Sequence, residues 1–274
     1  MKSIRSAAYV FSEATKAFFR DNCPNLSAAV AFYTSISIIP ILFLVFFVSG
    51  RILGSSSETH AAVLEFLEQL NPFIEDKIIL EIQRLSETTR FMGWVGLGFL
   101  LWISTMFVSS LETAFTIIFK VKKKRHFLMS AVMSVAVIPL GFCAILFYVA
   151  INAGASFLDR WEIGLPVVHN TTIRYIIPLS VIVLFFTLLY KVIPNRKIAF
   201  SDALVGGITC TVLIEVAKYL FDLYLASGGN PAGFVYGSLK ALVYLALWVF
   251  YIAWITLYAA EMVSVIVRRK EKAR

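Results

Sequence analysis

Six long stretches of the chain are almost entirely apolar, and this feature constrains the fold more than any other. Each is long enough to supply the roughly 20 helical residues that cross the roughly 30 Å hydrocarbon core of a bilayer. A helix pairs its backbone polar groups within one segment, as lipid requires, so we expect an all-α fold, a polytopic membrane helical bundle. The predicted spans are residues 26–50, 91–119, 127–157, 173–192, 203–225 and 239–267.

The composition of the whole chain favours the same fold class. Hydrophobic residues make up 59% of the 274 residues and charged residues 15%, and the mean hydropathy is +0.81. Soluble proteins average about 45–50% apolar and about 25% charged residues. This excess is too large for a water-soluble core, and we predict a single membrane domain over residues 1–274.

The Lys and Arg residues gather on one side of the predicted bundle. Seventeen of the 25 lie in the N-terminal segment, the second-to-third and fourth-to-fifth connections and the C-terminal tail. Cytoplasmic loops of membrane proteins carry an excess of these residues, so we predict that both termini are cytoplasmic. The net charge of +8 therefore lies beside apolar segments instead of on one basic face, and we predict no nucleic-acid partner.

Two segments outside the spans have a helical period. In residues 1–22, apolar residues recur from Ile4 to Phe19 with basic residues between them, which predicts an amphipathic helix. This helix lies either on the membrane surface, against anionic lipids of the cytoplasmic face, or on the cytoplasmic end of the bundle. The same charges interrupt the apolar run that a cleavable signal peptide needs. The acidic connection 51–90 has two helically spaced runs, which predict an outer helical cap.

Five ionisable residues fall inside predicted spans, where each costs about 2.5–3.5 kcal/mol unless it has a partner or faces water. They are Glu112 in the second span, Glu215, Lys218 and Asp222 in the fifth, and Glu261 in the sixth. The spacing of the three in the fifth span places them on one helix face. Glu112 and Glu261 each lie about two turns from the cytoplasmic end of a span and are expected to share a cavity there.

Two interpretations of these charges remain open. In the first, Lys218 and Asp222 form an ion pair within their helix, and the shallower acids contact neighbouring helices. In the second, the charges line a substrate or ion pathway, with Glu215 and Lys218 as its midplane contact.

Turn-forming and small residues mark further features. The connection before the sixth span forms either a simple hairpin or a re-entrant element at the outer mouth of the pathway. The outer-mouth candidates are Asn230, Pro231, Tyr236, Gly237 and Lys240. Small residues predict close helix packing in three spans. They are Ser27, Ala31 and Ser35, then Gly93, Gly96 and Gly98, and then Gly206 and Gly207.

Catalytic motifs are missing from the sequence. It contains no GxSxG, P-loop or GxGxxG pattern. The three histidines lie in separate connections, and the three cysteines are far apart without a CxxC pair. We therefore predict no metal site, no cofactor and no enzymatic activity.

Three stretches of sequence resemble the YihY/BrkB family of bacterial inner-membrane proteins. They are LSAAVAFYTS at residues 26–35 leading to Ile39 and Pro40, the stretch from Leu111 to Phe119, and YGSL at 236–239 followed by Leu247, Trp248 and YAAE at 258–261. The family usually has Gly where this chain has Ala259. The resemblance implies six spans in the inner membrane and an association with virulence. An earlier ribonuclease label of the family disagrees with this sequence, which lacks the metal ligands such an enzyme needs.

These features together predict a transporter or lipid-handling permease for an anionic or amphipathic substrate. The alternative is a non-transporting scaffold of the cell envelope that recruits partners through its outer cap or basic loops. The expected partners are the lipid bilayer and an unknown small-molecule or lipid substrate. The sequence leaves open whether the chain forms a homo-oligomer.

Overall fold

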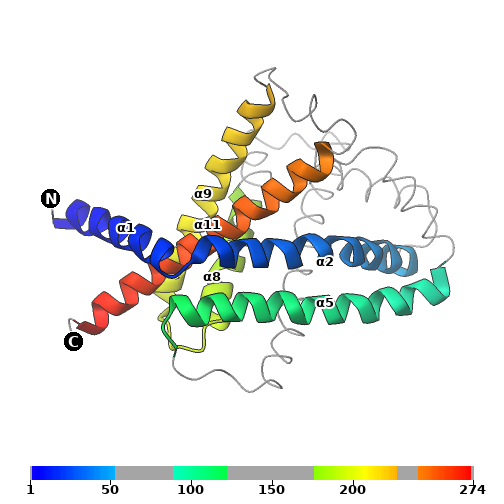
Figure 1. The fold of residues 1–274 in the computed structure, drawn as a ribbon, viewed down its shortest axis with the longest axis horizontal. Helices are drawn as coiled ribbons and strands as arrows, with labels where there is room; N and C mark the ends of the chain where they lie inside the picture. Colours follow the sequence, from blue (N-terminus) through cyan, green and yellow to red (C-terminus); the bar gives the residue numbers. More distant parts are fainter. Residues whose placement is uncertain (1, 53–88, 122–175, 227–239, 273–274) are drawn as a thin grey trace, which may run out of the picture.

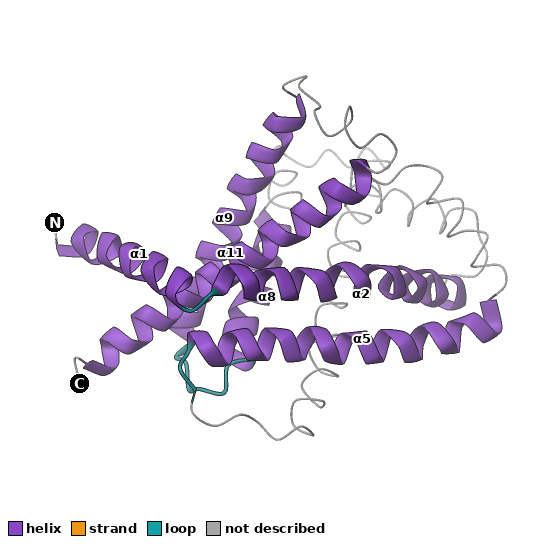
Figure 2. Ribbon diagram, viewed as in Figure 1, coloured by secondary structure: helices purple, strands orange, loops and turns teal. Residues whose placement is uncertain are grey.

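The computed structural model describes residues 2–52, 89–121, 176–226 and 240–272, and the regular structure in these ranges is helical (Figure 2). The helices are α1 (Lys2–Arg20), α2 (Cys23–Ile52), α5 (Thr89–Ile118), α8 (Ile177–Val192), α9 (Phe200–Ala226) and α11 (Lys240–Lys272). The all-α prediction is confirmed for this part of the chain. The predicted third span, the outer cap and the candidates Asn230, Pro231, Tyr236 and Gly237 lie outside the described residues.

Helix length and composition support membrane insertion for part of the bundle. Among the described residues, Phe200–Phe221 and Val243–Lys272 are long and apolar enough to cross a membrane. Thr105–Ile118 and Pro178–Val192 are apolar but shorter. The bundle of six spans therefore stays a prediction.

The helix ends follow local backbone chemistry. Asn22, with φ of 57°, turns the chain between α1 and α2, and asparagine is one of the few residues that adopts this left-handed conformation readily. Pro24 lies in the first turn of α2, where its missing N–H group would have no helical partner in any case. Lys120, two residues after the end of α5, also has a left-handed conformation, with φ of 54°. A residue in this conformation commonly ends a helix.

Helix α11 is the centre of the packing. It contacts α1, α2, α5 and α9, while α2 packs along α5 and α8 packs along α9. Figure 1 shows α11 crossing the other helices and both chain termini lying at the same end of the molecule. The buried core includes Phe115, Tyr190 and Leu257, and the Tyr190 hydroxyl donates to the Thr256 carbonyl at 3.0 Å.

Two adjacent glycines let α8, α9 and α11 approach closely. A Cβ atom on Gly206 would lie 2.3 Å from the Val263 side chain, and one on Gly207 would lie 2.3 Å from Thr187 Oγ1. Both distances are far below contact range, so the predicted small-residue packing is confirmed at these positions. A Cβ atom on Gly98 would meet nothing within 4 Å, so that glycine makes no close approach.

Helix α1 packs with one face against the part of α11 from Trp254 to Ile266. Val10 and Ala14 are buried against Val265, and the Thr15 hydroxyl lies 2.9 Å from the Tyr258 hydroxyl. Phe18 is also buried. Three aromatic residues of α1, namely Tyr9, Phe11 and Phe19, border this packed face and stay exposed. Each still touches α11, at Arg269, Tyr258 and Trp254 respectively. The structure therefore contains the packing that one of the two sequence interpretations expected.

Candidate functional site

The charged face of α9 carries an ion pair between Glu215 and Lys218. Their carboxylate oxygen and ammonium nitrogen lie 2.5 Å apart, and the side chains are 41% and 45% exposed. Neighbouring apolar side chains on this flank are also exposed, among them Val216 and Tyr219. Lys218 thus pairs with the residue three positions before it. The side chain of Asp222, the partner expected in one interpretation, is not among those described.

The second predicted acid, Glu112, is partly buried on α5, with one carboxylate oxygen shielded from solvent. The side chains around the Glu261 carboxyl group are Asp21, Cys23, Lys120 and Arg268. Glu112 is not one of them, and its shared cavity with Glu261 stays a prediction. Lys240, the last outer-mouth candidate, is the first residue of α11.

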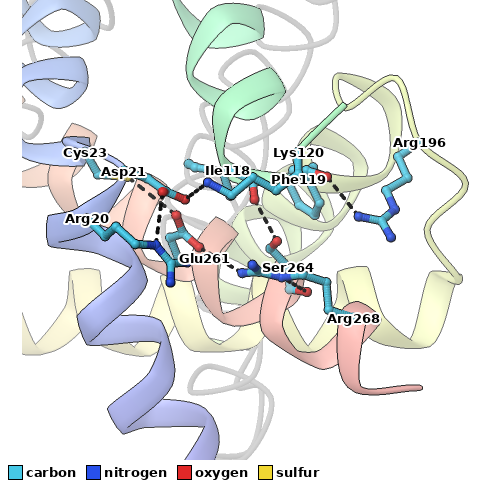
Figure 3. Close-up of polar contacts among 10 residues, drawn as sticks. All are labelled: Arg20, Asp21, Cys23, Ile118, Phe119, Lys120, Arg196, Glu261, Ser264 and Arg268. Atoms are coloured by element: carbon cyan, nitrogen blue, oxygen red, sulfur yellow. Dashed lines mark hydrogen bonds and ion pairs between the residues drawn. The ribbon is translucent and has the colours of Figure 1, made fainter. Parts of the chain in front are cut away.

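Glu261 lies at the centre of a buried polar cluster where several helices meet (Figure 3). Its side chain is fully buried. The thiol of Cys23, at the start of α2, points to Glu261 Oε1 with an S–O distance of 3.7 Å. Arg268, two turns later on α11, places a guanidinium nitrogen 3.6 Å from Oε2. This separation is too long for a hydrogen bond, and Oε2 has no hydrogen-bond donor in the described chain.

Asp21 brings a second carboxyl group to the cluster. It lies in the turn between α1 and α2, its side chain is 6% exposed, and it accepts a hydrogen bond from the Lys120 ammonium group. Arg20 lies 3.5 Å from it. The carboxyl groups of Asp21 and Glu261 are within hydrogen-bonding reach of each other. Figure 3 shows the two acids side by side, with the cations placed around them.

The same region closes the open end of α5. The last carbonyl groups of a helix lack partners within that helix and need external donors. Ser264 Oγ donates to the Ile118 carbonyl and Arg196 Nη1 donates to the Phe119 carbonyl, both at 2.8 Å. Each donor comes from a different part of the fold, so these two bonds fix the end of α5 against α11 and the α8–α9 connection.

The tail of α11 adds two ion pairs at this end. Lys270 pairs with Asp202, in the first turn of α9, at 2.5 Å. Glu271 pairs with Arg196 in the connection between α8 and α9. The acid at the start of α9 also lies where a carboxylate is favoured by the helix dipole. The cluster therefore continues along α11 as a set of charged contacts.

The chemistry of the cluster is that of proton exchange and hydrogen bonding. Burial, and next the Glu261 carboxyl group, raise the pKa of the Cys23 thiol, so this thiol stays protonated and donates. In the part of the chain that the structure describes, no group of three or more His, Cys, Asp and Glu side chains could hold a metal ion.

The sequence indicated Glu261 but not its partners. Asp21 and Cys23 lie before the first predicted span and 240 and 238 residues from Glu261, so no local pattern links them. The sequence indicates Arg268 only as one of the basic residues of the C-terminal tail. The one available signal was the spacing of Glu261 and Arg268, which places both on one face of a helix.

A family model described as "Virulence factor BrkB" matches residues 14–274. The chain belongs to this family. The BrkB match begins within α1 and contains all the helices that follow it among those described, so both charged regions lie inside it. The expected resemblance is thereby confirmed.

Relatives of this BrkB-family chain are named as membrane proteins. The UPF0761 membrane protein of Pseudomonas aeruginosa strain LESB58 is 26% identical over 260 residues, which cover 90% of this chain and 60% of the relative. That of Vibrio vulnificus strain YJ016 is 29% identical over 254 residues, covering 90% and 79%. The chain thus spans about 60% of the length of its Pseudomonas relatives. No solved structure matches it. These names, with the family match, identify the chain as a membrane protein.

Proposed function

We propose that the protein is a multi-pass inner-membrane permease for an amphipathic, lipid-like substrate with an anionic or zwitterionic head group. Glu215 and Lys218 are its contact near the middle of the membrane. Glu112, Asp222 and Glu261 belong to the same polar path, as the sequence predicts. The activity is transport, without a chemical step.

The half-exposed ion pair on α9 carries this proposal. Glu215 lies 15 residues into a helix of 27, so it is close to the middle of α9. A charge at that depth costs about 2.5–3.5 kcal/mol in lipid, and a flank that only faced acyl chains would be better served by apolar residues. A Glu–Lys pair remains neutral overall, yet it offers both charges to a phosphate and an ammonium group.

The apolar surroundings of the pair favour a lipid-like substrate over a small ion. Exposed side chains on the same helix, Val212, Val216 and Leu220, offer contact to an acyl chain. The pair then binds the head group while the tail stays in the bilayer, so the substrate does not have to leave lipid to cross.

The orientation with cytoplasmic termini belongs to this proposal. Arg20, Lys120 and Arg268 surround the polar cluster, and Arg196 lies beyond it at the Phe119 carbonyl. All four come from connections or ends that the sequence assigns to the cytoplasm. The exposed aromatic residues of α1, such as Tyr9 and Phe19, fit the head-group layer of the inner leaflet, and exposed Lys16 on the same helix attracts anionic lipids.

Lipid movement in vesicles tests the proposal. The purified full-length chain is reconstituted into vesicles of phosphatidylethanolamine and phosphatidylglycerol that carry a trace of fluorescent phosphatidylethanolamine. Dithionite bleaches only the outer leaflet, so about half of the signal is lost in a bilayer without exchange between leaflets. We expect a larger loss with the protein, and a loss near the protein-free value with Glu215→Gln or Lys218→Gln.

A charge exchange and a distant control sharpen the test. The double variant Glu215→Lys with Lys218→Glu retains an ion pair and should recover part of the activity if a neutral pair is what the head group needs. Lys197→Gln, an exposed cation in the α8–α9 connection, should behave as the parent protein. Vesicles that show no exchange with correctly folded protein would contradict the proposal and favour the envelope scaffold.

A further inference from the structure

The paired carboxyl groups of Asp21 and Glu261 are unequally supplied with hydrogen-bond donors. Asp21 accepts from Lys120 and has Arg20 at 3.5 Å, whereas the described residues offer Glu261 only the weak thiol donor of Cys23. Glu261 Oε2 is fully buried without any donor in the described chain. A buried carboxylate oxygen in this state costs free energy that a bound proton would recover.

We propose that Asp21 and Glu261 together form a binding site for a single proton, which joins the α1–α2 turn to α11. With the proton on Glu261, its carboxyl group donates to the Asp21 carboxylate. Release of the proton to a water molecule or buffer base leaves two carboxylates in contact. The pair then changes from one negative charge to two, with no other bond made or broken.

Among the described residues, the charged groups that face the pair are consistent with this assignment. The turn contributes Arg20, the segment after α5 contributes Lys120, and α11 contributes Arg268. Lys120 and Arg20 both lie on the Asp21 side, so Asp21 is the member that retains its charge. Within the described chain, Arg268 is the one cation that comes within 4 Å of the Glu261 carboxyl group, and its 3.6 Å separation leaves Oε2 without a hydrogen bond.

A second unpartnered group lies next to the pair along α2. Ser27 is one helical turn after Cys23 and therefore on the face that Cys23 turns to Glu261. Its hydroxyl is fully buried and has no hydrogen-bond partner in the part of the chain that is described. Buried hydroxyls of this kind are normally satisfied by a water molecule. This position offers a first step for the proton between the pair and the interior of the bundle.

Proton release has a mechanical consequence. Two adjacent carboxylates repel each other, and this repulsion acts between the turn at Asp21 and α11, which are also held together by the buried α1 face and by the packing of α2 on α11. We infer that the turn separates from α11 when the pair loses its proton. The site can be measured in a protein that moves no lipid, so this inference goes beyond the proposed function and does not depend on it.

Infrared titration of the full-length protein in lipid vesicles tests the proton directly. The carbonyl-stretch band of a protonated carboxyl group should disappear as the pH rises from about 5 to about 9, a range that covers the documented titration of buried glutamates. Glu261→Gln should remove this band. Glu271→Gln, an exposed acid on the same helix, is the matched control and should retain it. A band that survives in Glu261→Gln, or no such band in the parent protein, would overturn the proposal.

Hydrogen exchange of residues 20–27 tests the coupling to the turn. After correction for the chemical pH dependence, protection should fall about tenfold for each pH unit above the titration, the slope that release of one proton gives. Glu261→Gln keeps a donor to Asp21 and should hold protection constant. Asp21→Asn, as a second variant, should remove the slope as well. An unchanged slope in both variants would refute the coupling.

A comparison of salts tests whether the pair binds a sodium ion instead of a proton. At fixed pH, the thermal stability of the parent protein should be the same in sodium chloride and choline chloride. A sodium-dependent gain that Glu261→Gln abolishes would show that the pair binds a metal cation, and it would overturn the assignment to a proton.

Discussion

Gly206 and Gly207 occupy adjacent positions on α9 but face different neighbours. A Cβ atom on Gly206 would meet only side-chain atoms, a methyl group of Val263 and the ring of Tyr190, among its three nearest neighbours. A Cβ atom on Gly207 would lie 2.7 Å from the backbone oxygen of Val183 as well as 2.3 Å from Thr187 Oγ1. Backbone on α8 cannot move without shifting the whole helix, so the second glycine is the stricter requirement.

We therefore predict that Gly207→Ala destabilises the protein more than Gly206→Ala. The expected loss for Gly207→Ala is about 1–3 kcal/mol, as for other overpacked interiors. Gly98→Ala is the matched control, because its Cβ atom meets open space and alanine favours a helix by about 1 kcal/mol over glycine. Thermal unfolding of the three variants in one detergent measures the order. Equal midpoints for Gly98→Ala and Gly207→Ala would contradict it.

The positions of Lys218 and Glu261 in the sequence also show which of their contacts could be predicted and which could not. Helix geometry allows Lys218 a partner three residues before it or four after it, and only the side-chain conformation selects Glu215. The predicted span gives an expected depth for Glu261. It does not predict the neighbours of Glu261, because Asp21 and Cys23 are brought to it by tertiary packing across almost the full length of the chain.

At the scale of helices, α1 shows which features a periodic pattern predicts and which it does not. The recurrence from Ile4 to Phe19 predicted a helix, and α1 spans Lys2–Arg20. The pattern could not divide its aromatic residues, since both Phe18 and Phe19 fall within a wide apolar stripe. Both rings contact Trp254 on α11, but Phe18 also contacts Tyr258 and is buried, at 1% exposure, while Phe19 is 61% exposed.

This difference predicts opposite results for two neighbouring substitutions. Phe18→Ala should release α1 from α11, with a loss of about 3–5 kcal/mol if the site behaves as a protein core. Phe19→Ala should change folding stability much less, because Phe19 is largely exposed and only the edge of its ring meets Phe18 and Trp254. Limited proteolysis in detergent, followed at the connection between α1 and α2, compares the variants. Faster cleavage in Phe19→Ala than in Phe18→Ala would show that the exposed face holds α1 in place.

At the scale of the whole molecule, α11 links the ends of the other helices. Its tail pairs with Asp202 at the start of α9 and with Arg196 before it, and Ser264 closes α5. The sequence predicted a span ending at residue 267, with a basic tail beyond. The structure continues the helix to Lys272, where Lys270 and Glu271 find oppositely charged partners on other elements.

Charge distribution across the whole chain predicts that both termini face the cytoplasm. Green fluorescent protein fused to either terminus should fluoresce in intact cells, and alkaline phosphatase fused to either terminus should be inactive, because each reporter functions on one side of the membrane only. Removing the basic residues of the C-terminal tail should lower this preference but not reverse it, since the N-terminal segment and two connections carry the same bias. An active phosphatase fusion at either end would contradict the orientation.

The buried cluster around Glu261 also sets an order of events during synthesis. Its acids and cations come from residues 20–23, from the end of α5 and from α11, and the last of these leaves the ribosome after all the others. Until then Asp21 and Lys120 have each other, but the carbonyl groups at the end of α5 lack the Ser264 hydroxyl. A chain that stops short of α11 thus inserts with an unclosed helix end and unsheltered charges.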